Sequence, residues 1–222
     1  DSAQQNLKAL SVITLNGITG ELIDAKKLRT TLAAKRGTFD SKANVLELFD
    51  AIDVAGDAGM KAKLTRATID TKENIITSRE AVMVMMDAGT INANQMTVRQ
   101  KSKEYTFVDK VRTHLNARDG KAEQPAPEAK PDAMIGASNA PVDITSNRLD
   151  VNDNSKTALF TGMVNASQNG ASMTTPELEV SYEGSAEPQA GADPNGRGKV
   201  KRLLAKNPVV LKQANGDTVS SQ

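Results

Sequence analysis

The chain has 222 residues and a net charge of +1, with 38% apolar residues, 3% aromatic residues and no tryptophan. This balanced charge predicts no general attraction to nucleic acid or to an anionic membrane surface. The absence of cysteine excludes disulfides, thiolate metal sites and cysteine nucleophiles. No apolar run approaches the roughly 18 residues that a membrane-spanning helix needs.

The first candidate element lies within Ser11–Arg36, where two structures stay open. The stretch DAKKLRTTLAAKR at Asp24–Arg36 is rich in good helix formers and could form one short helix. However, Ala34 also fits a strand frame that recurs along the chain, and we favour a strand here for that reason.

A repeated unit follows, because Thr38–Val54 (TFDSKANVLELFDAIDV) and Thr68–Val84 (TIDTKENIITSREAVMV) align without a gap and share six of seventeen residues. A repeat near this length indicates one supersecondary unit stacked on copies of itself. Three apolar or small residues, spaced three and then two apart, mark the frame. They occur at Ala34/Gly37/Phe39, Leu64/Ala67/Ile69, Ala93/Met96/Val98, Ser146/Leu149/Val151 and Thr175/Leu178/Val180.

Each unit is predicted to be two or three short antiparallel strands, because its apolar residues alternate with a period of two. The turn sequences DSKAN, DTKEN, RQKSK and NDNSK recur between the strands. Asp and Asn favour such turns, since their side chains bond the local backbone. The step of three within each triplet predicts a bulge or bend in that strand.

The segment Ala117–Ala140 interrupts the repeat and is rich in Ala, Pro, Gly and charge, which indicates a flexible insertion. Without it the step of 53 residues between Val98 and Val151 becomes 29, as between neighbouring copies. We therefore expect 1–116 and 141–222 to carry repeated antiparallel β units on either side of a flexible 117–140, with strands of the two parts paired into one body. Ser185–Lys199 is predicted to be a second loop, within the last copy.

Eight residues are predicted to face inward, because they occupy the last triplet column and a β-branched column thirteen residues later. They are Phe39, Ile52, Ile69, Val82, Val98, Val111, Val151 and Val164. In the fifth copy the second column is predicted to reach Val209. Two interpretations of these columns stay open on the residues alone: they fill a dry core, or they line a trough between two sheets.

Catalytic and metal sites are not indicated by the sequence. His114 is the single histidine, so no Ser/His/Asp arrangement or metal-ligand cluster is suggested, and we expect a residue at a strand end. Asp40 and Asp70 lie in turn sequences and are expected to serve turns or solvent. The basic stretch GRGKVKR at Gly196–Arg202 does not fit a phosphate-binding loop. We expect no enzyme activity, no cofactor and no metal.

The repeat unit resembles the OstA-like β-jellyroll of the bacterial lipopolysaccharide export machinery. Leu32–Leu115 is similar to LptC, the membrane-anchored periplasmic component of that ABC transporter. Pro141–Gly184 is similar to LptA, its soluble bridge partner, with TALFTGMV and the following Gln-Asn-Gly turn as the most specific stretch.

The resemblance implies an all-β, elongated, open jellyroll that cradles lipid acyl chains and passes them between stacked units without chemistry of its own. The eight inward residues would then form the acyl-chain groove. The implied partners are lipopolysaccharide, the inner-membrane ABC transporter subunits and other OstA-like jellyrolls. The implied location is the periplasm, with tethering to the inner membrane by an N-terminal helix that this chain lacks.

Two further expectations follow from the stacked sheet. Its ends present unpaired backbone groups, so jellyroll partners are expected to add by edge-strand pairing, with Asn207–Gln213 and the following DTVSSQ as the C-terminal edge. The alternative function is a structural β-solenoid scaffold with a dry core and no lipid ligand.

Overall fold

Strands make up every regular element in the computed structural model, which describes residues 2–5, 11–23, 29–56, 59–86, 88–116, 140–182 and 200–221. In chain order they are β1 (Ser2–Gln5), β2 (Val12–Ile23), β3 (Arg29–Asp40), β4 (Val45–Gly56), β5 (Lys61–Asp70), β6 (Ile75–Ser78), β7 (Val82–Met86), β8 (Gly89–Ala93), β9 (Gln95–Arg99), β10 (Glu104–Leu115), β11 (Val142–Asn152), β12 (Thr157–Gln168), β13 (Ala171–Tyr182), β14 (Val200–Ala205), β15 (Val209–Lys212) and β16 (Thr218–Ser221).

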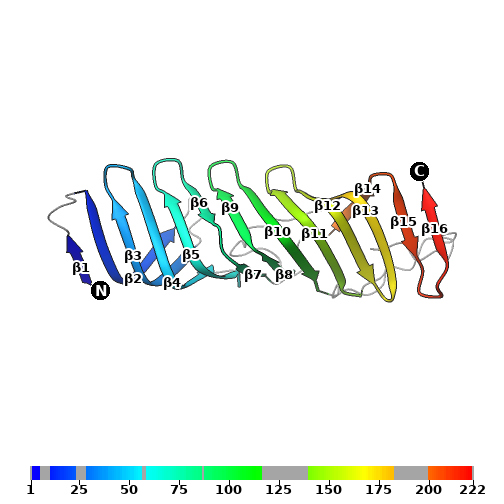
Figure 1. Ribbon diagram of the computed structural model, residues 1–222, viewed down its shortest axis with the longest axis horizontal. Helices are drawn as coiled ribbons and strands as arrows, with labels where there is room; N and C mark the ends of the chain where they lie inside the picture. The colour runs from blue at the N-terminus through cyan, green and yellow to red at the C-terminus, as the bar shows by residue number, and fades with distance from the viewer. Residues whose placement is uncertain are drawn as a thin grey trace.

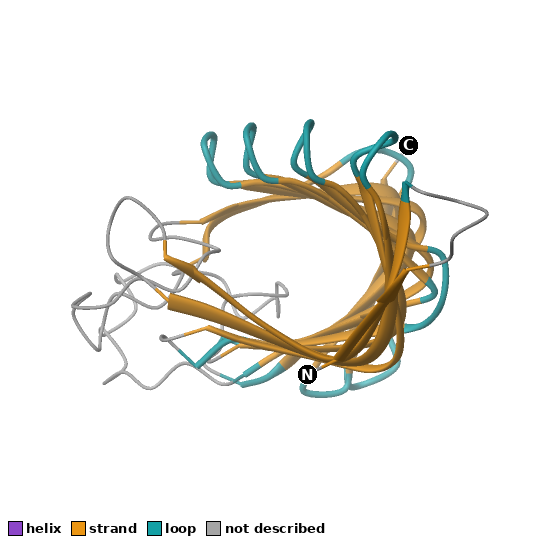
Figure 2. Cartoon of the chain, turned by 90° about the vertical axis from the view of Figure 1, so that its left-hand side faces the viewer, coloured by secondary structure: helices purple, strands orange, loops and turns teal. Residues whose placement is uncertain are grey.

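These strands form one antiparallel sheet, in which strands adjacent in sequence are mostly adjacent in space. Figure 1 shows them side by side along an elongated body, with the two termini at opposite ends. Viewed along that body, the sheet curls into an open, jellyroll-like cross-section (Figure 2). The predicted all-β jellyroll is confirmed, and the helix considered for Asp24–Arg36 is wrong for Arg29–Arg36, which belongs to β3.

Stacked turns run along one side of the sheet, at the positions that the repeated turn sequences predict (Figure 2). The Asp40 carboxylate accepts hydrogen bonds from the backbone amides of Lys42 and Ala43, and Asp70 does the same one repeat later. Each turn also bonds to the next, as where the Thr71 amide donates to the Asn44 carbonyl at 2.9 Å. The bonds between turns hold successive repeats in register. The Ala43 and Lys42 amides lower the pKa of the Asp40 carboxyl, because they favour its charged form.

A corner divides the sheet into two walls, because the inward alternation slips once in each long strand. Leu64 and Ala67 of β5 are both buried although three residues apart. Their partners Ile52 and Leu48 on β4 are four apart, and Asp50 between them is exposed. The step of three therefore does mark a bend. We call the segments between turns and corner the turn wall and the segments beyond the corner the far wall.

The extra residue at the corner lies on the strand that neighbours each triplet. In β4, β10 and β12 the ladder shifts by one residue where two consecutive residues have positive φ. The pairs are Asp50–Ala51, Asp109–Lys110 and Gly162–Met163. The sequence thus predicted the position of the bend, and the structure places the bulge on the partner strand.

The two parts flanking the insertion pair directly with each other. Strand β10 pairs with β11 from Glu104↔Asn152 to Leu115↔Val142, with one register shift at the corner. The ladder thus joins Leu32–Leu115 to Pro141–Gly184 in one sheet, as expected. Residues 117–139 and 183–199 lie outside the described residues, so the predicted loops there and the domain boundaries stay predictions.

Sheet edges lie at both ends of the described strands. At the C-terminal end β14 pairs with β13, and β15 pairs with both β13 and β16. Val210 is therefore paired on both sides, with Thr174 and with Ser220, so the expected edge is wrong for Asn207–Gln213, whereas the following DTVSSQ holds the outermost strand β16. Among the described residues, β14 and β16 are the outermost strands at this end.

Candidate functional site

The concave face of the turn wall carries an unbroken apolar row. Starting at β2 and ending at β14, residues directly opposite each other in the printed register are all apolar or aromatic. The row is Ile13, Phe39, Leu46, Ile69, Ile76, Val98, Tyr105, Val151, Ala158, Val180 and Leu203. The row continues from β10 to β11, where Tyr105 stands opposite Val151, with no charged residue between them.

A second row runs along the far wall in the same way and contains a single polar residue. Its members are Leu32, Val54, Ala62, Val84, Ile91, Thr113, Ile144, Ala166, Met173, Leu211 and Val219. The two rows face the interior from opposite sides of the corner. Together they give the concave face an apolar lining along most of the body.

The eight predicted site residues divide between two rows with different burial. Ile52, Val82, Val111 and Val164 lie at the corner and are at most 3% exposed. We call these four the corner row. Val209 of β15, predicted for the fifth copy, is half-buried and packs against the core.

The other four predicted residues, Phe39, Ile69, Val98 and Val151, are half-buried on the turn wall. We call these four the turn row. Ile69, Val98 and Val151 pack against the buried core, yet each keeps part of its surface accessible. The turn row therefore offers apolar surface that a ligand can reach, whereas the corner row closes the fold.

The convex face is polar where the concave face is apolar. Thr68, Thr77, Thr97 and Thr106 stand opposite one another on four neighbouring strands of the turn wall. Such cross-strand threonine pairs stabilise a sheet without offering an apolar surface. The Phe49 ring is covered by the Arg66 guanidinium, whose central carbon lies 4.7 Å from the ring centre.

Buried hydroxyl groups complete the corner, and the sequence columns gave little indication of their role. The Ser146 Oγ donates to the Arg148 carbonyl at 3.0 Å, and the Thr175 Oγ1 lies 2.9 Å from the Glu177 carbonyl oxygen and 2.6 Å from that of Lys206. Ser78 repeats this contact with Glu80. In each case the hydroxyl satisfies a backbone group two residues later, where the strand bends and the ladder is interrupted.

One buried carboxylate lies at the stacked turns rather than in the apolar interior. Asp153 is 3% exposed, its Oδ1 lies 3.0 Å from the Lys156 Nζ, and it accepts a hydrogen bond from the Tyr182 hydroxyl at 3.2 Å. Burial, and then the Asp153 charge, raise the pKa of Tyr182, so the hydroxyl stays protonated and keeps donating. These contacts tie the β11–β12 turn to β13 and indicate a structural role.

His114 is near the end of β10, as predicted, and its Nδ1 lies 2.8 Å from the Asp143 Oδ1. Ser167 stands opposite Asp143 on the next strand. The carboxylate thus lies between the histidine and the serine, which is the wrong order for a nucleophile activated by an imidazole base. Within the described residues no three His, Cys, Asp or Glu side chains gather in a way that could hold a metal ion.

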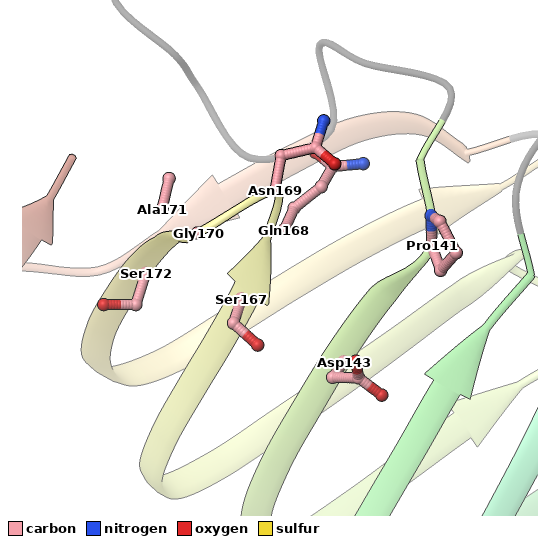
Figure 3. Close-up of a pocket in the computed structure, with 8 residues that line it drawn as sticks. All are labelled: Pro141, Asp143, Ser167, Gln168, Asn169, Gly170, Ala171 and Ser172. Atoms are coloured by element: carbon pink, nitrogen blue, oxygen red, sulfur yellow. The ribbon is translucent and has the colours of Figure 1, made fainter. Parts of the chain in front are cut away.

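An open hollow of about 310 Å³ lies beside this group, at the ends of β11, β12 and β13 (Figure 3). Its lining is mostly polar and includes Asp143, Ser167 and Ser172. At its rim the Gln168 Nε2 donates a hydrogen bond to the Ala140 carbonyl at 2.7 Å. A second hollow of about 450 Å³ lies near the corner, between Lys63, Met83 and Arg112.

Comparison with known families identifies the N-terminal part. Residues 4–116 match the family model described as lipopolysaccharide-assembly, LptC-related. This match covers half of the chain, including every strand from β2 to β10. The chain belongs to the LptC-related family.

The C-terminal part of this LptC-related chain matches a second family model. Residues 143–220 match the LptA/LptD N-terminal domain of lipopolysaccharide transport proteins. The match extends beyond Gly184, to which the sequence resemblance reached, and includes β14, β15 and most of β16. Among curated proteins, no sequence matches the chain.

Both family matches connect the chain with lipopolysaccharide transport, and proteins of these families are transport components. The predicted order, an LptC-like part followed by an LptA-like part, is confirmed. No helix in the described part of the chain is long and apolar enough to cross a membrane.

Proposed function

We propose that this protein is a non-enzymatic component of the lipopolysaccharide export bridge, which holds lipid acyl chains against its concave face and passes them between stacked jellyroll units. The observation that carries the proposal is the pair of apolar rows that continue across β10 and β11, from the LptC-like part into the LptA-like part. At this junction Tyr105 of β10 stands opposite Val151 of β11, so a lipid on the turn wall would meet a continuous apolar and aromatic surface.

The energetics support a weak, repeated grip rather than a single tight site. Each acyl CH₂ group removed from water contributes about 0.8 kcal/mol, so a chain lying along several strands gains most of its affinity from contact area. Val, Ile and Leu side chains bind without directional constraints. A lipid could therefore move along the row from strand to strand while its contacts are replaced by equivalent ones.

The sheet edges support stacking with other jellyrolls. At the C-terminal end β14 and β16 are outermost among the described strands, and Leu204 and Val219 there are 42% and 53% exposed. We propose that these edges receive OstA-like partners by strand addition, while inner-membrane ABC transporter subunits supply the energy. The proposed location is the periplasm, and tethering by a helix preceding Asp1 stays a prediction.

Native mass spectrometry of the intact chain mixed with purified lipopolysaccharide tests lipid binding directly. We expect a lipid-bound species that is lost when Val98 is replaced by Lys, because the charge interrupts the turn row. Thr97→Lys, on the convex face of the same strand, is the matched control and should keep the lipid.

The burial of the corner row is the observation that favours the alternative, a scaffold with a dry core. That alternative predicts no lipid-bound species at any lipopolysaccharide concentration, with the wild type and both lysine variants behaving alike. Such a result would overturn the proposed function while leaving the fold unaffected.

A further inference from the structure

Thr113 is the polar residue in the far-wall row, and it is 5% exposed. Its neighbours in register are Ile91 on β8 and Ile144 on β11, which are 7% and 1% exposed. Among the described residues, its Oγ1 is the buried side-chain N or O atom that has no hydrogen-bond partner. The hydroxyl is thus enclosed by aliphatic side chains with its hydrogen-bonding capacity unused.

A buried hydroxyl without a partner destabilises a fold, and the other buried hydroxyls of this chain show the usual remedy. Ser78, Ser146 and Thr175 each bond a backbone carbonyl two residues later. Thr113 lies past the corner, in regular β10 pairing between two strands, away from the interrupted ladder where the other hydroxyls find their carbonyls. A partner for its buried hydroxyl would have to enter between the two walls.

The surroundings of Thr113 limit which chemical groups could accept a hydrogen bond from its hydroxyl. The surrounding lining is aliphatic, so a charged group would be left without a counter-charge and a strongly hydrated one would lose its water. An acyl lipid carries one suitable group next to its hydrocarbon chain, the carbonyl of the ester or amide linkage. A carbonyl oxygen accepts a hydrogen bond from a hydroxyl and needs no charge partner.

We infer that the Thr113 hydroxyl donates a hydrogen bond to the linkage carbonyl of a bound acyl chain, an inference that rests on the proposed function. Thr113 lies on β10, the last strand before the junction with β11. This hydrogen bond would fix the position of the lipid along the sheet, with its linkage carbonyl at β10 and its hydrocarbon chain against the apolar rows. Thr113 is then a specificity-determining residue that distinguishes acyl lipids from hydrocarbon of the same length.

Two single-chain phospholipids with the same head group and chain length test this inference, one ester-linked and one ether-linked. Binding of each to the intact chain is measured by titration calorimetry for the wild type, Thr113→Val and Thr113→Ser. Val replaces the hydroxyl by a methyl group of similar size, and Ser keeps the hydroxyl. We expect the wild type to prefer the ester by about three- to tenfold, the range that one neutral hydrogen bond supplies.

The variants separate the outcomes. Thr113→Val should bind both lipids equally and unfold at the same or a higher denaturant concentration, because it removes an unpartnered buried hydroxyl, and Thr113→Ser should keep the preference. An ester preference that survives in Thr113→Val, or is absent from the wild type, would overturn the inference, with the hydroxyl then satisfied by water. Absence of binding by either lipid to any of the proteins would instead count against the proposed function.

Discussion

The corner row and the turn row arise from the same repeat but differ in what surrounds them. Val111 of the corner row is 1% exposed, whereas Val98 of the turn row keeps part of its surface accessible. The corner residues pack where two walls meet, so both walls cover them. The turn residues stand on one wall near its outer end. The comparison teaches that one apolar column stabilises the curl while the other leaves a surface for a ligand.

The largest expected difference between the rows follows from placing a charge in each. Val111→Asp buries a carboxylate without a partner and should cost several kcal/mol, enough to unfold much of the protein. Val98→Asp should cost less than half as much, because the half-buried carboxylate can reach water. Urea unfolding followed by circular dichroism measures both. Equal losses would show that the turn row is as dry as the corner row.

Truncation of the same residue type in the two rows gives a matched pair with a smaller effect. Ile52→Ala should lower the free energy of unfolding by about 2–5 kcal/mol, since Ile52 is 1% exposed and a cavity would remain. Ile69→Ala should lower it by about half that amount, because its surroundings can relax into solvent. Guanidinium denaturation checks the pair, and a larger loss for Ile69→Ala would contradict the assignment of the rows.

The corner itself is expected to depend on its hydroxyl contacts. Ser146→Ala removes the hydrogen bond from Oγ to the Arg148 carbonyl and should cost about 1 kcal/mol. Ser155→Ala, at an exposed turn, is the control and should change stability by less than about 0.5 kcal/mol. Thermal unfolding compares the two. If they behave alike, the corner is held by apolar packing without help from its hydroxyls.

The smallest effect is expected from shortening the insertion. Deleting 123–133 leaves Leu115 paired with Val142, and a short hairpin connection suffices between such strands. The shortened chain should melt in a single transition near the wild-type temperature. Two transitions in calorimetry, each matching one isolated part, would show that the apolar rows do not form one body across the junction.

The repeat made the fold predictable because turns and alternation are local properties. The aspartates that cap the turns, Asp40 and Asp70, accept hydrogen bonds from the amides two and three residues later, so their spacing could be read from the sequence. The elongated all-β body and the pairing of strands across the insertion followed from the same frame, and the jellyroll followed from the family resemblance. The helix considered near Arg29 was wrong, because helix-forming residues were overridden by pairing with β2 and β4.

The shared frame of the eight residues could be read from the sequence, but their division into two rows of different burial could not, and their contact with acyl chains stays a prediction. The columns treated Val98 and Val111 as equivalent, since both are β-branched residues at fixed places in the unit. Their burial depends on how the two walls fold against each other at the corner, which the alternation along a single strand does not reveal. The unpartnered hydroxyl of Thr113 could not be foreseen for the same reason, because a threonine in a strand usually finds a partner or faces solvent.

Photo-crosslinking along one strand pair tests the central claim most directly, that the concave turn row contacts acyl chains. Benzoylphenylalanine is placed at Ile69 and Val98, and at their convex-face neighbours Thr68 and Thr97, in the chain exposed to lipopolysaccharide. We predict lipid adducts at Ile69 and Val98 and background labelling at the two threonine positions. Equal labelling of both faces, or labelling of the convex face alone, would contradict the account.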